Sequence, residues 1–80
     1  MNMTSDEDFI LVPNIIPTTR IIEPIAIKRG VAKQLLAAKG DSQSIYALSL
    51  QHKVSLQAAE YISHLELVEI ERSSKYIGAL

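Results

Sequence analysis

The sequence predicts a mainly α-helical domain with a small β component: an extended apolar N-terminal arm, then three helices, then a C-terminal β-hairpin. Three observations lead to this prediction. Residues 9–27 are rich in isoleucine but contain three prolines. Residues 28–66 place apolar side chains at helical spacing between capping residues, and residues 68–71 alternate apolar and acidic side chains. We therefore divide this single domain into a flexible acidic segment at 1–8, the arm at 9–27 and a folded unit at 28–80.

Length and composition exclude several classes of protein. Eighty residues suffice for one hydrophobic core, and the absence of cysteine excludes disulfides and cysteine zinc sites. No segment approaches the roughly 20 apolar residues of a membrane span, so we expect a soluble cytoplasmic protein without membrane contact. The net charge of -1 is uneven: residues 1–27 carry four acidic groups and one basic group, whereas residues 28–80 carry seven basic and five acidic groups. The second part is a weak candidate for a phosphate-binding surface.

The arm is too apolar to remain in water. Each proline favours extended backbone at the preceding residue and lacks an N–H group, which is typical of an edge strand or an arm. The segment therefore packs either on the domain's own core or on a second copy of the chain. In the second case the dimer contacts are Phe9, Ile10, Leu11, Val12, Ile15, Ile16, Ile21 and Ile22.

The first helix follows the arm directly. Its apolar face is predicted at Ile27, Val31, Leu35 and Ala38, and its outer, basic side at Lys28, Arg29, Lys33 and Lys39. Gly40 is well placed just past its end.

Two further helices begin at good capping residues. Asp41 or Ser42 caps the second helix, which ends near residue 51 or 52, and Ser55 caps the third. The predicted inward-facing residues are Ile45, Leu48, Ala58, Ile62 and Leu65, with Tyr46 as a further candidate.

The alternation at 68–71 predicts a half-buried strand that turns at 72–75 and returns at 76–80. In the alternative prediction the third helix continues through Ser74, supported by Glu71 and Lys75 at i and i+4.

No catalytic motif is present. Three scattered glycines cannot form a phosphate-binding loop. Glu60 and His64 share a helical face, but two ligands do not make a metal site, so we interpret them as a surface pair. We expect neither enzymatic activity nor a cofactor or metal.

The stretch LSLQHKVSLQAAEYISHLELVEIER, residues 48–72, resembles the helix-turn-helix and first wing strand of small winged-helix transcription regulators. Lys53-Val54-Ser55 corresponds to their Gly-Val-Ser turn, and Leu65-Glu66 to the Leu-Glu that closes their recognition helix. Lys53 stands where the family has glycine, and His52 stands at a position that is usually apolar.

The resemblance implies a sequence-specific double-stranded DNA-binding regulator. Its third helix would enter the major groove, where Gln57 would contact adenine and Glu60 cytosine. The implied DNA-binding residues are Lys53, Ser55, Gln57, Glu60, Tyr61, His64, Arg72 and Lys75. Because the third helix carries no Lys or Arg, a homodimer that reads two half-sites is expected. The alternative is a small protein-binding adaptor, inhibitor or antirepressor on the same scaffold, without DNA binding.

Overall fold

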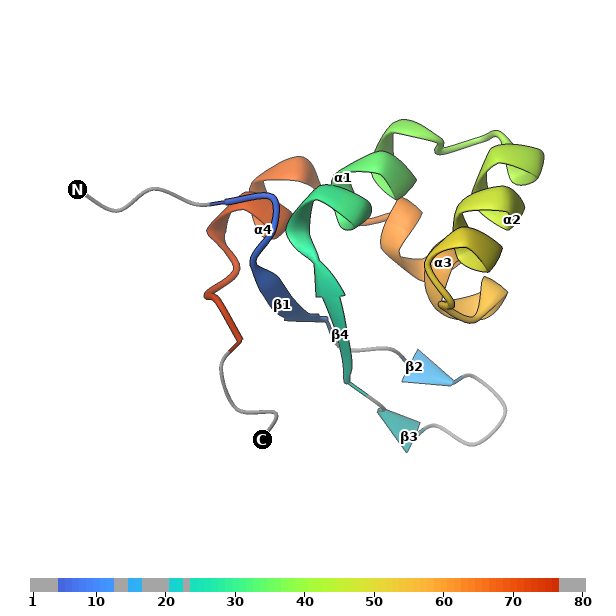
Figure 1. Cartoon of the computed structure of the whole chain (residues 1–80). Coiled ribbons are helices and arrows are strands. Elements are labelled where there is room, and N and C mark those ends of the chain that lie inside the picture. The colour runs from blue at the N-terminus through green and yellow to red at the C-terminus, as the bar shows by residue number, and fades with distance from the viewer. Residues whose placement is uncertain (1–4, 13–14, 17–20, 23, 77–80) are drawn as a thin grey trace.

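A computed structural model describes residues 5–12, 15–16, 21–22 and 24–76. Within them a β-hairpin precedes four helices (Figure 1). The strands are β1 (Phe9–Val12), β2 (Ile15–Ile16), β3 (Ile21–Ile22) and β4 (Ile25–Lys28). The helices are α1 (Arg29–Ala37), α2 (Ser42–Gln51), α3 (Leu56–Ser63) and α4 (Leu67–Arg72).

The isoleucine-rich segment folds back on itself as an antiparallel hairpin. β1 pairs with β4, with Val12 opposite Ile25, and β2 pairs with β3, with Ile15 opposite Ile22. Ile15 lies three positions after Val12, and Ile22 lies three positions before Ile25. The β1–β4 and β2–β3 pairings therefore have the same register.

Pro24 is compatible with this pairing because of its position. The N–H of Arg29 donates to the carbonyl of Asp8 at 2.8 Å. Since bonded and non-bonded pairs alternate along an antiparallel ladder, Ile25 is at a bonded position and Pro24 at an outward-facing one. A proline there removes no hydrogen bond of the hairpin.

The prediction of an extended arm ahead of the helices was wrong, because these residues pair with one another. Ile10 and Val12 are buried, whereas Phe9 and Leu11 on the opposite face of β1 are exposed. The hairpin thus supplies part of the domain's own core.

The three helices predicted within 28–66 are present. Asp41 caps α2 by accepting the N–H of Ser44 at 3.2 Å, and Ser55 caps α3 by accepting the N–H of Ala58 at 3.1 Å. α3 packs against both α1 and α2. The buried core cluster draws on the hairpin and all four helices: Ile10, Val12, Ile27, Val31, Ala32, Leu35, Ile45, Ala59, Ile62 and Ile70.

The predicted C-terminal wing was also wrong. Residues 67–72 form α4, and the described chain ends at residue 76 without a hairpin after α3. On a helix Val68 and Ile70 point in different directions, and Ile70 is buried while Val68 is half-exposed. The chain after α4 instead reaches β1: Lys75 forms a β-bridge with Ile10, and the N–H of Tyr76 donates to the carbonyl of Phe9 at 2.7 Å.

Arg29, predicted on the outer side of the first helix, is buried and joins both ends of the described chain. Its Nε donates to the carbonyl of Ile70 at 3.3 Å, and another nitrogen donates to the carbonyl of Ser73. Its third nitrogen donates to the carbonyl of Ser5 at 2.9 Å and to the Asp8 carboxylate at 3.2 Å. The charge is therefore neutralised and its hydrogen-bonding capacity is used, as a buried guanidinium requires.

The Asp8 carboxylate is the anionic partner in this arrangement. Burial raises the pKa of Asp8. The hydrogen bonds donated by the Ser5 N–H and by Arg29, together with the charge of Lys75, lower this pKa by a larger amount. The net result is that the pKa of Asp8 lies below its ordinary value.

Gly30 permits the N-terminal segment to lie close to α1. Its N–H donates to the carbonyl of Asp6 at 2.9 Å. A Cβ at this position would lie 2.9 Å from the Cβ of Asp6, too close without movement of the segment.

None of the helices in the described part of the chain is long and apolar enough to cross a membrane.

Candidate functional site

The candidate site is the pair α2 and α3 with the turn that joins them. α2 lies at the end of the molecule farthest from α4, and α3 runs from beneath α2 back toward α1 (Figure 1). The turn at 52–55 is short because α2 ends at Gln51 and the Ser55 cap begins α3 directly afterwards. α1 packs against both of these helices.

Lys53 adopts a left-handed backbone conformation in this turn, with φ of 56°. The N–H of Val54 donates to the carbonyl of Ser49 at 2.9 Å, and the N–H of Lys53 donates to that of Leu50 at 3.4 Å. These two bonds form the Schellman motif that ends many helices, in which glycine usually occupies the left-handed position. The side chain of Lys53 is exposed, so a cation occupies a position that glycine would fill with less strain.

The exposed side of α3 and its C-cap carries three of the eight residues predicted from the resemblance. Gln57, Glu60 and His64 are exposed, at the spacing of one helical face. Tyr61 is only partly exposed because it packs against the core cluster. The hydroxyl of Ser55 is engaged as the cap of α3.

Arg72 and Lys75 do not join this group. Arg72 lies in the last turn of α4, which is on the opposite side of α1 from α2 (Figure 1). Lys75 lies beside β1, with its Nζ 3.8 Å from the Asp8 carboxylate.

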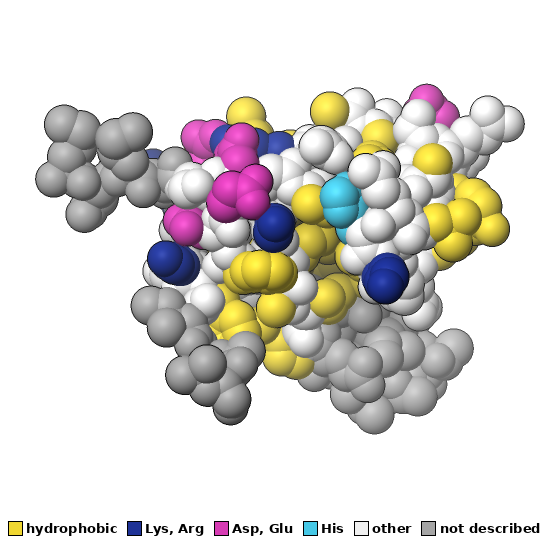
Figure 2. Space-filling view, in the orientation of Figure 1, with side chains coloured by type: hydrophobic (Ala, Val, Ile, Leu, Met, Phe, Trp, Pro, Cys, Tyr) yellow, Lys and Arg dark blue, Asp and Glu magenta, His cyan; other side chains and the backbone are white. Residues whose placement is uncertain are grey.

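Ion pairs neutralise much of the basic side of α1. The Nζ of Lys28 lies 3.0 Å from Glu7, and that of Lys33 lies 3.0 Å from Asp6 and 2.9 Å from Glu71. The hydrogen bonds that Lys33 donates to the Glu71 and Asp6 carboxylates raise the pKa of Lys33 above its ordinary value. Figure 2 shows the resulting mixture of acidic and basic side chains over the N-terminal segment and α1.

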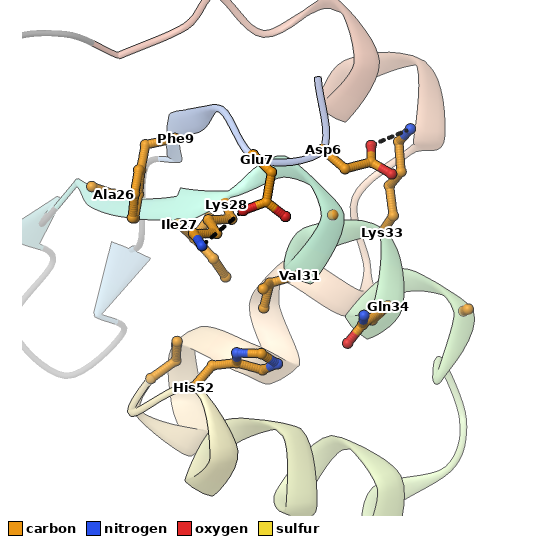
Figure 3. A pocket seen from close by; sticks show the side chains of 13 residues that line it. Asp6, Glu7, Phe9, Ala26, Ile27, Lys28, Val31, Lys33, Gln34 and His52 are labelled. Atoms are coloured by element: carbon orange, nitrogen blue, oxygen red, sulfur yellow. Dashed lines mark hydrogen bonds and ion pairs between the residues drawn. The ribbon is translucent and has the colours of Figure 1, made fainter. Parts of the chain in front are cut away.

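A groove of about 700 Å³ separates the hairpin from the α2–α3 turn. Its apolar walls include Phe9, Val31 and Val54, and yellow side chains are visible in this hollow in Figure 2. Figure 3 shows the His52 ring reaching from the turn toward Val31 of α1, with Lys28 on the hairpin side. The Nε2 of His52 is buried without a hydrogen-bond partner among the described residues.

A smaller groove of about 250 Å³ lies between the start of α2 and α3. Glu60 and His64 line it together with Ile45 and Leu56. Within the described ranges no three potential ligand side chains gather to hold a metal ion.

The residues predicted for dimerisation are divided by the hairpin. Ile10 and Val12 are buried in the core and are unavailable to a second copy, whereas Phe9 and Leu11 remain exposed. The other four lie in β2 and β3, and their side-chain environments fall outside the described part of the structure: Ile15, Ile16, Ile21 and Ile22.

Sequence reasoning missed the solvent face of α2. Tyr46, a candidate core residue, is 53% exposed, and Leu50, one turn later, is 62% exposed. A signal was available: α2 contains no charged residue, although it lies on the surface. Figure 2 shows hydrophobic side chains gathered over α2 at the right-hand edge.

No protein-family model matches the chain, and no curated protein or solved structure compared with it matches either.

Proposed function

We propose that the chain is a double-stranded DNA-binding transcription regulator that uses α2 and α3 as a helix-turn-helix and acts as a homodimer. The observation that carries this proposal is the exposed cation of Lys53 in a left-handed turn directly before α3. Residues held in unfavourable backbone conformations concentrate at functional sites. A lysine at this position is suited to a phosphate that flanks the major groove.

The side chains of α3 supply the reading surface. Gln57 donates to and accepts from adenine, and Glu60 accepts from the amino group of cytosine. His64, one turn beyond Glu60 on the same exposed face, extends this surface.

The charge distribution sets the affinity expected for one protomer. α2 and α3 contain no Lys or Arg, and Arg72 and Lys75 lie beside α4 and β1. Since each neutralised phosphate contributes about 0.9 to the salt dependence of binding, a protomer relying on one or two cations binds weakly. Two protomers that occupy half-sites about 34 Å apart double these contacts.

The test is binding to mixed genomic DNA fragments over a salt series. Replacing Lys53 by glycine removes a phosphate contact while relaxing the turn. We expect weaker DNA binding and a salt slope shallower by about 1, together with undiminished thermal stability. Lys53→Arg keeps the charge and should retain binding.

Lys75→Gln is the matched control because it removes one positive charge on the other side of the molecule. Equal weakening by Lys53→Gly and Lys75→Gln would show that net charge alone is responsible. Absence of binding by the wild type at about 50 mM salt, where phosphate contacts are strong, would refute the proposal.

A second candidate is a protein-interaction module without DNA binding. The uncharged, partly apolar face of α2 favours it, because interface cores are depleted of charge and enriched in tyrosine. Under this alternative Lys53→Gly leaves every interaction unchanged, whereas Leu50→Glu abolishes partner binding.

A further inference from the structure

The solvent face of α2 has a composition unusual for an exposed helix. Gln43, Tyr46, Ala47 and Leu50 follow the i, i+3, i+4, i+7 spacing of one helical stripe, and all four are exposed. The two large members, Tyr46 and Leu50, are 53% and 62% exposed. This stripe, which we call the α2 face, has no charged member.

The α2 face is symmetric about the midpoint between Tyr46 and Ala47. If two α2 helices met in antiparallel orientation on a two-fold axis through that point, Tyr46 would lie over Ala47 of the second copy. Gln43 would lie along Leu50 of the second copy. A large side chain would thus meet a small one at the centre, which is the complementarity that helix packing requires.

Charge also allows contact with a second copy. In a two-fold contact a patch meets itself, so a patch with a net charge meets the same net charge on the second copy. The α2 face avoids this penalty because α2 has no charged residue.

Other exposed apolar residues are less suited to such a contact. Leu67 and Val68 of α4 are flanked by the acidic Glu66 and Glu69. Self-association through this α4 surface would bring carboxylates together. On the hairpin, the Nζ of Lys28 lies 5.9 Å from the centre of the Phe9 ring and 3.0 Å from Glu7, so a contact there would have to take an ion pair out of water.

We infer that the α2 face is a homodimer interface in which two copies of α2 pack antiparallel about a two-fold axis. This inference is independent of DNA binding. A ten-residue helix is about 15 Å long, so the contact lies below the roughly 1,200 Å² of a standard interface. The dimer is accordingly weak and forms at tens to hundreds of micromolar protein, as expected for about 5 to 6 kcal/mol of binding free energy.

Sedimentation of the full chain from about 10 μM to 1 mM tests the inference. We expect concentration-dependent dimerisation, which Leu50→Glu weakens at least tenfold. Val68→Glu is the matched control, since Val68 is 50% exposed and lies on α4. The Val68→Glu variant should dimerise to the same extent as the wild type. Because both residues are at least half-exposed, both variants should fold, and circular dichroism verifies this.

A cross-linking experiment identifies the interface directly. The natural chain has no cysteine, so a single introduced thiol reports one contact. Ala47→Cys, beside the proposed axis, should form a disulfide-linked dimer under mild oxidation, whereas Gln57→Cys on α3 should not. A monomeric wild type at 1 mM, a Leu50→Glu variant that dimerises like the wild type, or cross-linking of Gln57→Cys in place of Ala47→Cys would each overturn the inference.

Discussion

Lys53 carries a backbone strain that can be measured separately from its function. A non-glycine residue at φ of 56° is disfavoured by about 1 kcal/mol relative to glycine. We therefore predict that Lys53→Gly raises the free energy of unfolding by about 1 kcal/mol, or about 4 to 8 °C in Tm for a domain of this size. Urea denaturation and calorimetry provide the measurement.

Gly40 supplies the matched control for that prediction. It also has a positive φ, of 87°, and a Cβ there would meet no heavy atom within 4 Å. Gly40→Ala thus introduces backbone strain without a steric clash and should destabilise the fold by about 1 kcal/mol. If both substitutions shifted stability in the same direction, the left-handed conformation would not be the cause.

Asp8 should make the fold sensitive to acid. Because its pKa in the folded state is lowered, its contribution to stability is fully present above the unfolded value of about 3.9. That contribution is lost as the pH falls through the lower folded value. We predict that Asp8→Asn is less stable than the wild type at pH 7 and that the difference shrinks below about pH 4. Urea midpoints measured from pH 7 to pH 2.5 give the comparison, and parallel profiles would contradict it.

At the scale of single residues, the sequence predicted local contacts and missed distant ones. The Asp41 and Ser55 caps are read within three positions and are confirmed. The burial of Arg29 depends on carbonyls 41 and 44 positions away along the chain. No local pattern encodes such partners, so the prediction placed Arg29 on the outside of its helix.

Among the helices, α4 is the one that the sequence pattern misassigned as a strand. The alternation of apolar and acidic residues at 68–71 is typical of a strand. In the short helix that forms instead, Ile70 is buried and Val68 is exposed. We predict that Ile70→Ala costs about 2 to 4 kcal/mol, because Ile70 is 1% exposed, and that Val68→Ala changes stability by less than about 0.5 kcal/mol. In a strand both residues would share one face, so similar losses in urea denaturation would contradict the helix.

The hairpin shows a second limit of sequence reasoning at this scale. Periodicity and caps predicted α1, α2 and α3, because those signals lie within each helix. Pairing of β1 with β4 depends on residues that are 13 to 19 positions apart. Proline was interpreted as typical of an edge strand or an arm, which left pairing within the segment undecided, and Pro24 falls at an outward-facing position of the ladder. The sequence predicted the turn at 52–55. It did not predict that Arg72 and Lys75 lie far from this turn, because their positions depend on how α4 folds.

Across the whole molecule, the close approach of the N-terminal segment to α1 determines which side chain position 30 tolerates. We predict that Gly30→Ala destabilises the intact chain, because its Cβ would lie 2.9 Å from that of Asp6. In a chain without residues 1–6 the same substitution should be stabilising by roughly 0.5 kcal/mol, since alanine favours helix over glycine. Thermal unfolding of the four proteins tests this reversal of sign. Destabilisation of equal size in both backgrounds would exclude contact with Asp6 as the cause.

The Arg29 contacts also impose an order on the synthesis of the chain. Ser5 and Asp8 leave the ribosome early, but the carbonyls of Ile70 and Ser73 that complete the binding of Arg29 emerge more than 60 residues later. At 5 to 20 residues per second this delay is on the order of 3 to 13 seconds. α1, α2 and α3 are synthesised within that interval, while the charged side chain of Arg29 still lacks two of its final partners. The guanidinium stays hydrated until α4 docks, so docking of α4 is the step that removes this charge from water.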